Sequence, residues 1–249
     1  QLWLEHDVVQ SPTIAALGTE HGFDVQTLEG GYKAYRNALL EYFSKALPLR
    51  VLSGPTGSMK TFILQEMRRQ GAQVVDLEGL ARHMGSSFGN LMCSGQPTTE
   101  QFQNDVFAAF STLDTRKPIW LEDESFSIGK VHFPEPLFHQ KQKAPVLRLQ
   151  LPRQRRIQVL VEQYGQLSAG QLVRATEGIA RRLGGANTTQ AITLIQAGKL
   201  SEAADIILRY YDAAYENARR TKEEKMPHIR KELTFNNEPV AEIAAHILK

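Results

Sequence analysis

Val51-Leu52-Ser53-Gly54-Pro55-Thr56-Gly57-Ser58-Met59-Lys60-Thr61 passes from an apolar run through a glycine-rich loop into a helical pattern. It follows the phosphate-binding pattern G-x-x-x-x-G-K-[ST] at all but one position. In that pattern backbone N–H groups surround phosphate oxygens, the lysine neutralises them and the hydroxyl reaches Mg²⁺. The N-terminus of the helix that follows also favours anions. We therefore predict that Gly54 to Thr61 binds phosphate groups; a glycine-rich turn that only joins a strand to a helix is the alternative.

Met59 replaces the second glycine of this pattern. Glycine is used where the backbone takes a left-handed angle or passes close to a ligand. We therefore expect Met59 either to adopt an unusual backbone angle or to crowd the bound phosphate.

The composition is typical of a folded protein with one large domain or two modest ones: the chain has 249 residues, of which 42% are hydrophobic. No apolar run approaches the roughly 18 residues of a membrane span, and no segment has the pattern of a signal peptide. We expect a cytoplasmic protein without a membrane partner. Cys93 is the only cysteine, which excludes an internal disulfide and an all-cysteine metal cluster; we expect it to be a small, half-buried side chain.

Charge is distributed unevenly along the chain. The 29 basic and 27 acidic residues give a net charge of +2, but residues 130–230 hold 17 basic and 9 acidic residues, or +8, which leaves −6 for the rest. An excess of Lys and Arg favours contact with the phosphates of a nucleic acid. A solvated helical surface is the alternative explanation of the same excess.

Strand and helix patterns alternate as far as Pro152, which favours a mostly parallel sheet with right-handed crossovers. The expected strands are Asp24–Leu28, Leu49–Leu52, Gln73–Leu77, Ile119–Leu121 and Val146–Leu151. The expected helices of this part are Thr13–His21, one opened by Glu29-Gly30-Gly31-Tyr32 and running through Lys45, Thr61–Gln70 and Thr99–Leu113.

After Pro152 the apolar residues recur at helical spacing and we expect no further strand. The helices expected here are Arg156–Tyr164, Ser168–Leu183, Thr188–Gln196, Ser201–Arg220 and Val240–Leu248. The chain is thus divided into an α/β segment at 1–46, a phosphate-loop core at 47–152 and a helical part at 153–249 packed on the core.

Acidic residues follow the expected strand Ile119–Leu121. In a phosphate-loop protein an acid at the end of such a strand holds Mg²⁺ directly or through water. We predict this role for Asp123, with Glu122 and Glu124 as rivals, and predict that Thr61 completes the metal shell. The alternative is that these acids only end the strand in solvent.

A second group of polar residues follows the expected strand Gln73–Leu77, at the same ligand-binding edge of the sheet. Arg82, Ser86 and Ser87 are predicted to contact phosphate. His83 is a candidate for proton transfer, and Asp123 is the other candidate catalytic residue. A structural role for His83 is the alternative, because no partner is visible in the sequence.

Six motifs, taken in order, resemble those of the tRNA 2-selenouridine synthase family. The motifs are Leu28-Glu29-Gly30-Gly31-Tyr32-Lys33-Ala34-Tyr35-Arg36, the loop Gly54 to Thr61, Asp76 to Gly89 with Gln96-Pro97, Trp120-Leu121-Glu122-Asp123-Glu124-Ser125 with Ile128-Gly129, Arg182-Leu183-Gly184-Gly185, and Tyr210-Tyr211-Asp212-Ala213-Ala214-Tyr215. Together they cover about residues 1 to 220. Each motif alone is weak evidence for the family, but the occurrence of all six in the same order over most of the chain is strong evidence.

The resemblance implies an N-terminal rhodanese-like domain, here partial at 1–46, joined to a P-loop NTPase-like domain. It implies an enzyme that acts on the wobble 2-thiouridine of tRNA. A geranyl group from geranyl diphosphate is first attached to the sulfur, and the alkylthio group is then replaced by selenium from selenophosphate. Mg²⁺ is a candidate cofactor because of the phosphate loop and the acids described above, and not because of the resemblance. The residues expected to contact tRNA are Arg153, Arg155, Arg156, Arg181 and Arg182.

Two departures from the family pattern shape the functional hypotheses. The stretch Gln1 to Ser11 matches the loop in which the family carries a rhodanese cysteine, and it holds none; Met59 is the other departure. We expect a fragment, a processed product or one half of a split enzyme with a separate rhodanese chain, and no selenation by this chain alone. The alternatives are a catalytically degenerate homologue that binds tRNA or a partner, and a generic P-loop ATPase or kinase.

Overall fold

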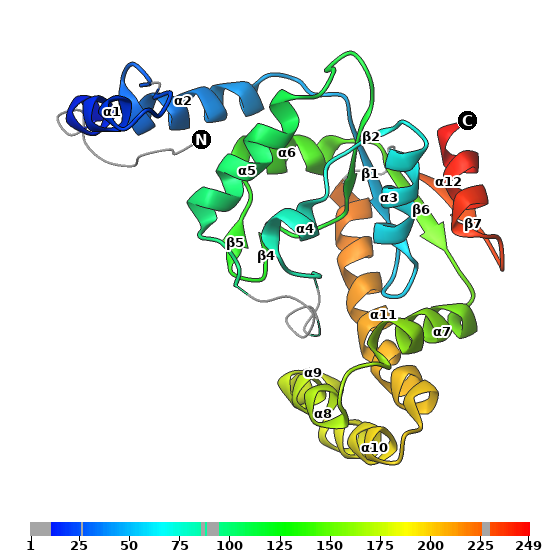
Figure 1. Ribbon diagram of the computed structural model, residues 1–249. Coiled ribbons are helices and arrows are strands. Elements are labelled where there is room, and N and C mark those ends of the chain that lie inside the picture. The colour runs from blue at the N-terminus through cyan, green and yellow to red at the C-terminus, as the bar shows by residue number, and fades with distance from the viewer. Residues whose placement is uncertain (1–10, 26, 86–87, 89–94, 226–229) are drawn as a thin grey trace.

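A five-stranded parallel sheet forms the centre of the molecule. The computed structural model describes residues 11–25, 27–85, 88, 95–225 and 230–249. The sheet has the order β2-β3-β1-β6-β7, and every pairing between neighbours is parallel. Its strands are β2 (Gln73–Val74), β3 (Ile119–Glu122), β1 (Leu49–Ser53), β6 (Val146–Gln150) and β7 (Arg230–Thr234). The expected α/β fold with a mostly parallel sheet is confirmed (Figure 1).

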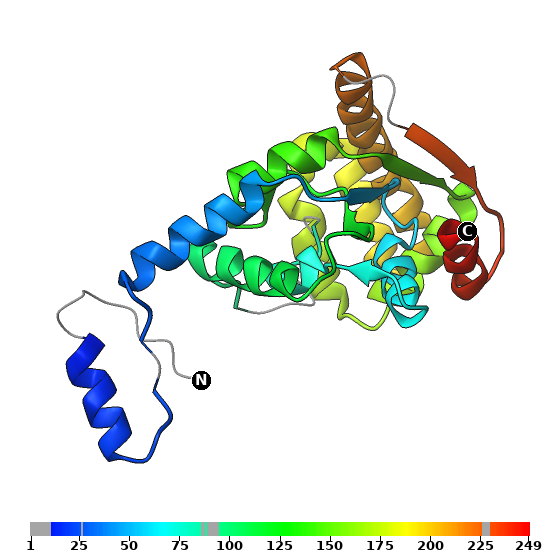
Figure 2. The ribbon, with the colours of Figure 1, turned by 90° about the horizontal axis from the view of Figure 1, so that it is seen from above.

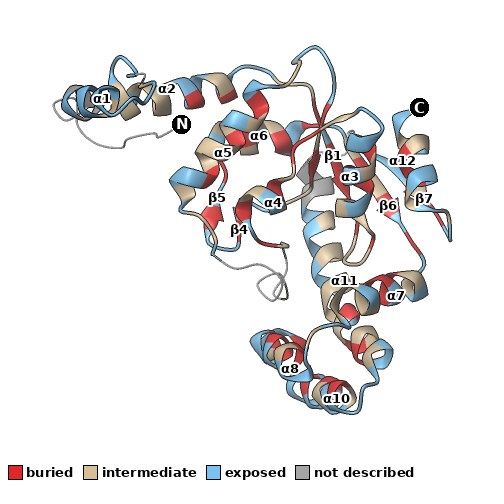
Figure 3. Ribbon diagram, viewed as in Figure 1, coloured by how far each residue is buried: buried red, intermediate tan, exposed pale blue. Residues whose placement is uncertain are grey.

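One face of the sheet is covered by the helices α2 (Gly31–Ser44), α4 (Leu77–Ala81), α5 (Thr99–Ser111) and α6 (Glu135–Lys143). Phe43 of α2, Phe110 of α5 and Val51 of β1 belong to one buried cluster there. Side chains of β1 alternate between the two faces, so its apolar run is buried on both sides, as is usual for a central parallel strand. Figure 3 shows this burial in red along the sheet and the inner sides of its helices.

The other face is covered by α3 (Lys60–Arg69) and α12 (Val240–Leu248). Ile63 of α3 and Ile243 of α12 are both fully buried against Leu52 of β1. These contacts hold α3, and with it the loop that precedes α3, firmly on the sheet.

Five helices between β6 and β7 form a separate cluster. They are α7 (Arg153–Tyr164), α8 (Ala169–Gly178), α9 (Ala180–Leu183), α10 (Gly185–Gln196) and α11 (Leu200–Lys225). Ser168 starts α8 with a capping box, in which its hydroxyl accepts the N–H of Gln171 and the Gln171 side chain accepts the N–H of Ser168. In Figure 1, α8 to α10 lie at the bottom of the view, away from the sheet.

The N-terminal segment extends away from the sheet domain, as Figure 2 shows for α1 (Ser11–Glu20). The strand expected at Asp24–Leu28 is wrong: its described residues form no strand, and the described residues before β1 hold only helices and irregular chain. A strand needs a partner for its N–H and C=O groups, and none of the described residues pairs with this segment. The expected helices on either side of it are found.

The expectation of no strand after Pro152 is also wrong, because β7 pairs with β6 along its whole length. Its sequence Arg230-Lys231-Glu232-Leu233-Thr234 is largely polar, as an edge strand with one neighbour allows. The strand expected at Gln73–Leu77 is shorter than predicted, because β2 ends at Val74 and the helix α4 begins at Leu77. The helix expected at Ser168–Leu183 is found as the two helices α8 and α9. The sequence also did not predict α6 or the hairpin of β4 (Ser127–Ile128) and β5 (Val131–His132).

Candidate functional site

The loop Gly54 to Thr61 joins the end of β1 to the start of α3, at the carboxyl edge of the sheet. Two of its glycines have no room for a side chain. A Cβ on Gly54 would lie 2.7 Å from Ser58 Oγ, and one on Gly57 would lie 2.8 Å from the carbonyl oxygen of Arg156. Gly57 also has a φ of +81°. Neighbouring atoms leave no room for a side chain at Gly54 or Gly57, and Gly57 also has a left-handed backbone. The fold therefore requires glycine at both positions even when no ligand is bound.

Met59 has a φ of +59° and a ψ of +20°, in the left-handed region, immediately before α3. The predicted unusual backbone angle is confirmed. For a residue with a Cβ this conformation costs roughly 1–2 kcal/mol. The Met59 side chain packs against the cluster formed by α3, α12 and the sheet, and this contact offsets part of the cost.

Lys60, the first residue of α3, is held inside the loop. Its ammonium donates to the carbonyl oxygen of Gly54 at 3.0 Å and lies 3.4 Å from Glu122 Oε1. Burial alone would lower the pKa of Lys60, but Glu122, Glu124 and Glu78 outweigh burial and raise it. Lys60 is therefore a fixed positive charge beside the loop.

Thr61 faces two carboxylates. Its Oγ1 lies 3.1 Å from Glu78 Oε2 and 3.1 Å from Glu122 Oε2. A hydroxyl has one proton and can donate to only one of them at a time. The arrangement therefore favours either a proton on one carboxyl group or a cation among the three oxygens.

Glu78, Glu122 and Glu124 form an acidic cluster whose nearest carboxylate oxygens all lie within 4.8 Å of one another. Burial, followed by repulsion from Glu122, raises the pKa of Glu78 to about 8 and that of Glu124 to about 7. Gly85 lies against the cluster, and a Cβ there would be 2.6 Å from Glu78 Oε1. Glu122 is buried and Glu78 and Glu124 are half-buried. Hard carboxylate oxygens next to a threonine hydroxyl match the ligands that Mg²⁺ takes in proteins.

Asp123, the predicted metal ligand, has different partners. Its carboxylate accepts a hydrogen bond from Ser53 Oγ at 2.9 Å and lies 3.3 Å from Lys141 Nζ. Lys141 is buried and also donates to the carbonyl oxygen of Glu124 at 2.5 Å. The structure thus places Asp123 in a link between β1, β3 and α6, whereas its rival Glu122 faces Thr61. A metal-binding or catalytic role for Asp123 stays a prediction.

His83 and Arg82 follow α4 at the same edge. His83 is buried, burial lowers its pKa, and its Nδ1 has no hydrogen-bond partner among the described residues. It is therefore neutral near pH 7. Arg82 is exposed and donates to the carbonyl oxygen of Gly95 at 3.4 Å. Ser86, Ser87 and Cys93 lie outside the described residues.

The predicted tRNA contacts divide into two groups. Arg156 is buried and binds Asp212 through both terminal nitrogens, at 2.7 and 2.9 Å, and donates to the carbonyl oxygen of Thr56 at 3.0 Å. Arg153 and Arg155 are likewise engaged within the chain: Arg153 binds Asp205 and Asp212, and Arg155 donates to the carbonyl oxygens of Asn236 and Glu238. Arg181 and Arg182 are exposed on α9, where Arg182 also donates to the Tyr210 hydroxyl at 3.4 Å.

An apolar pocket adjoins the phosphate loop. It begins at Thr56 and continues among the helices α7, α8, α10 and α11. Its walls include Leu160, Tyr164, Leu172, Ala204, Leu208 and Tyr211. The cavity volume is about 80 Å³; one water needs about 10–15 Å³ on this measure, so the cavity has room for several water-sized groups. A short aliphatic chain fits its size and its lining.

Sequence analysis missed several residues of this site. Glu78 lies in the stretch that was singled out after the second expected strand, but nothing in the sequence indicated that it would face Thr61. Lys141 belongs to a helix that was not expected. Tyr215, whose hydroxyl lies 3.1 Å from Ser53 Oγ, occurs in a family motif, which was the available signal.

The strand, the glycine-rich loop, the fixed lysine and the helix together define a phosphate-loop protein. The sequence model described as the tRNA 2-selenouridine synthase AAA domain matches residues 47–234, and the chain belongs to this family. No helix in the described part of the chain is long and apolar enough to span a membrane.

Curated relatives carry the name tRNA 2-selenouridine synthase. The protein from Shewanella woodyi is 33% identical over 242 residues, that from Shewanella piezotolerans is 36% identical over 231 residues, and that from Alcanivorax borkumensis is 31% identical over 242 residues. These matches cover 83%, 79% and 84% of this chain. The chain spans 64%, 62% and 66% of these relatives, less than two thirds of their length.

A solved structure, TT1252 from Thermus thermophilus, is also similar to the chain. It has a TM-score of 0.40 and 14% sequence identity, over 82% of this chain and 95% of that one. A TM-score of this size is too low to relate the two folds.

Proposed function

We propose that this chain is the phosphate-loop part of an enzyme that modifies the wobble 2-thiouridine of tRNA, and that it binds the diphosphate of a prenyl donor. The observation that carries the proposal is the position of the apolar pocket, which begins at Thr56 of the phosphate loop. One ligand with an anionic head and an apolar tail would occupy both. The base of a nucleoside triphosphate would find few hydrogen-bonding side chains in such a pocket, whose lining is mostly aliphatic and aromatic.

The residues of the loop support binding of the anionic head. Lys60 supplies a fixed positive charge, and Ser58 Oγ is buried without a hydrogen-bond partner in the described part of the chain. An unsatisfied buried hydroxyl costs free energy, which a phosphate oxygen would recover. Thr61, Glu122 and Glu78 would hold a divalent cation, which when bound would neutralise further charge on the diphosphate.

The reaction proposed is transfer of the geranyl group to sulfur. A C–S bond forms between the 2-thiouridine sulfur and the first carbon of the chain, the C–O bond to diphosphate breaks, and the proton on N3 of the base is released. Lys60 would stabilise the negative charge that develops on the departing diphosphate. Selenophosphate would serve the later selenium step, for which we assign no residue of this chain.

The test is geranyl transfer by the purified chain. We expect geranylated nucleoside, detected by mass spectrometry, after incubation with geranyl diphosphate and 2-thiouridine tRNA. Ala204→Phe fills the pocket and should lower this product at least tenfold while leaving the affinity for inorganic diphosphate unchanged. Ala197→Phe, at an exposed position of the same helical cluster, is the matched control. Thermal melting checks that Ala204→Phe folds, since overpacking costs about 1–3 kcal/mol.

Other results of these assays would support the alternative functions considered from the sequence. Binding of tRNA without turnover, unchanged by Met59→Gly, would indicate a catalytically degenerate homologue. ATP hydrolysis in the absence of tRNA would indicate a generic ATPase. If Ala204→Phe transfers geranyl as fast as the unmodified chain, the pocket does not hold the prenyl tail.

A further inference from the structure

A basic groove lies at the amino ends of the parallel strands, on the edge of the sheet opposite the phosphate loop. It is lined by the starts of β1, β2, β3, β6 and β7, the segment that follows α3 and the end of α12, and has a volume of about 850 Å³. The end of α12, marked C in Figure 2, lies at this edge. We call this hollow the basic groove. Its cationic side chains are those of Arg50, Lys117, Lys143, Lys231 and Lys249, and Trp120 is also part of its lining.

No acidic side chain among the described residues compensates the charge of the basic groove. All five of its Lys and Arg side chains are exposed, and none of them makes an ion pair with another described residue. No aspartate or glutamate lines the groove. An adjoining hollow shares Arg50 and Lys143 and adds Arg116, which is paired with Asp114. Cations that line one groove without acidic side chains between them repel one another, and a polyanion would relieve that repulsion.

The basic groove also contains an aromatic side chain, Trp120, which is not required for the binding of a simple anion. It is half-buried, packs against the core below it and pairs in register with Arg50 on β1 and Val74 on β2. Paired residues of adjacent strands point to the same face of the sheet, so Trp120 and Arg50 lie on one face at neighbouring positions. Aromatic side chains within a basic groove are the features on which bases of single-stranded nucleic acids stack.

We propose that the basic groove is an RNA-binding site that holds a single-stranded segment, with its phosphates on the lysines and arginine and one base on Trp120. This site is separate from the phosphate loop, since the two lie at opposite edges of the sheet. It goes beyond the proposed function and does not depend on it. A small inorganic anion would leave the indole unused, and an acidic protein would have no need of a stacking surface.

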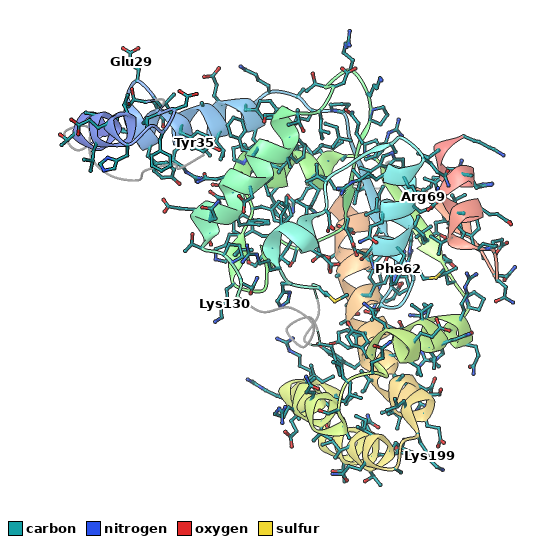
Figure 4. The ribbon with its side chains drawn as sticks, viewed as in Figure 1. Glu29, Tyr35, Phe62, Arg69, Lys130 and Lys199 are labelled. Atoms are coloured by element: carbon teal, nitrogen blue, oxygen red, sulfur yellow. The ribbon has the colours of Figure 1, made fainter. Side chains whose placement is uncertain are left out.

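The experiment uses the fluorescence of Trp120. The sequence has two tryptophans, Trp3 and Trp120, so Trp3→Phe leaves Trp120 as the only one. We expect an unstructured oligouridylate to quench its emission. The double variant Lys117→Glu/Lys143→Glu should weaken binding at least tenfold and lower the slope of log affinity against log salt by about 0.7 for each RNA phosphate that is no longer neutralised. Lys199→Glu is the control, because Lys199 lies at the far end of the helical cluster (Figure 4).

Three results would overturn the proposal. Oligouridylate could leave Trp120 emission unchanged; the double variant could bind RNA as tightly as the parent, with an equal salt slope; or polyglutamate could quench Trp120 as strongly as RNA, which would indicate an acidic protein partner. Circular dichroism checks that the variants fold. Lys60→Ala separates this proposal from the previous one, because it should abolish geranyl transfer and leave quenching by RNA intact.

Discussion

Met59 combines a left-handed backbone with a side chain that packs on the core. Met59→Gly removes both the strain and the packing and adds freedom to the unfolded chain. We therefore expect the unfolding free energy to change by less than about 1 kcal/mol. Affinity for inorganic diphosphate should rise about tenfold, or about 1.4 kcal/mol, because the backbone can then approach the phosphate without a Cβ. Isothermal titration calorimetry measures this.

Met59→Ala is the matched control for that variant. Alanine keeps the Cβ and the left-handed strain but loses the packing, so it should be less stable than the parent and bind diphosphate no more tightly. Equal affinity of the glycine variant and the parent would show that the Cβ of Met59 does not obstruct the ligand.

Glu78 and Glu124 make the stability of the chain depend on pH when divalent ions are absent. In the folded state the pKa of Glu78 is raised to about 8 and that of Glu124 to about 7, whereas an unfolded glutamate titrates near pH 4.3. Between these values the folded state holds protons that the unfolded state has lost. The unfolding free energy should therefore fall as the pH rises from about 4.5 to about 8.

Urea denaturation in the presence of a chelator measures this dependence. Glu78→Gln should flatten the fall, because glutamine does not titrate, whereas the exposed Glu41→Gln on α2 should leave it unchanged. A rise in stability over this interval, or an equal slope for Glu78→Gln and the parent, would contradict the prediction.

At the scale of single residues, the sequence predicted backbone angles and residue types more successfully than it predicted which side chains contact one another. The glycine pattern correctly predicted that position 59 needs an unusual φ, because that requirement is local. Which acid faces Thr61 depends instead on how β3 ends relative to α3 and α4. Glu122 and Asp123 are adjacent in the sequence, but they point to different partners because successive side chains of a strand alternate between faces.

At the scale of elements, α7 and α11 hold the phosphate loop from outside. Arg156 of α7 binds Asp212 of α11 and the carbonyl oxygen of Thr56 in the loop. Asp212→Ala would leave the buried Arg156 guanidinium without its carboxylate. We expect this to lower the unfolding free energy by about 2–3 kcal/mol and to weaken diphosphate binding, as measured by chemical denaturation and calorimetry.

Asp205→Ala is the control for this prediction, because Asp205 binds the more exposed Arg153 and Arg209 on the same helices. Its loss should cost about 1 kcal/mol or less and leave diphosphate binding unchanged. Equal losses of unfolding free energy in the two variants would show that the contact of Arg156 with the loop does not stabilise the fold more than the exposed ion pairs of Asp205 do.

Elements with strong local signals were predictable and the others were not. The long amphipathic helices were expected nearly where they occur, because their apolar spacing is set by the helix itself. β2, β4 and β5 have two residues each, too few to show a period. β7 is mostly polar, so its own sequence does not predict a strand. It forms because it pairs with the open edge of β6, and the first residue of that pairing, Val146, lies 84 residues before its partner Arg230.

For the whole molecule, charge along the sequence and charge on the surface differ. The basic excess at 130–230 predicted a polyanion-binding surface there, yet three of its arginines, Arg153, Arg155 and Arg156, are engaged within the fold. Four cations of the basic groove, Arg50, Lys117, Lys231 and Lys249, lie outside that window. They meet only because parallel strands all begin at one edge, which a count along the chain does not detect.

The cluster α7 to α11 leaves the sheet after β6 and returns to it at the adjacent strand β7. Its exit and entry points are therefore neighbours, and the strand order is the same whatever lies between them. The helices α8 to α10 can therefore be exchanged for others of different size without a change in strand order, whereas α7 carries Arg156, which contacts the phosphate loop, and α11 carries its partner Asp212. If the apolar pocket holds the tail of a ligand as proposed, a change in α8 or α10 would alter the choice of tail and leave the phosphate loop in place, because residues of both helices line the pocket.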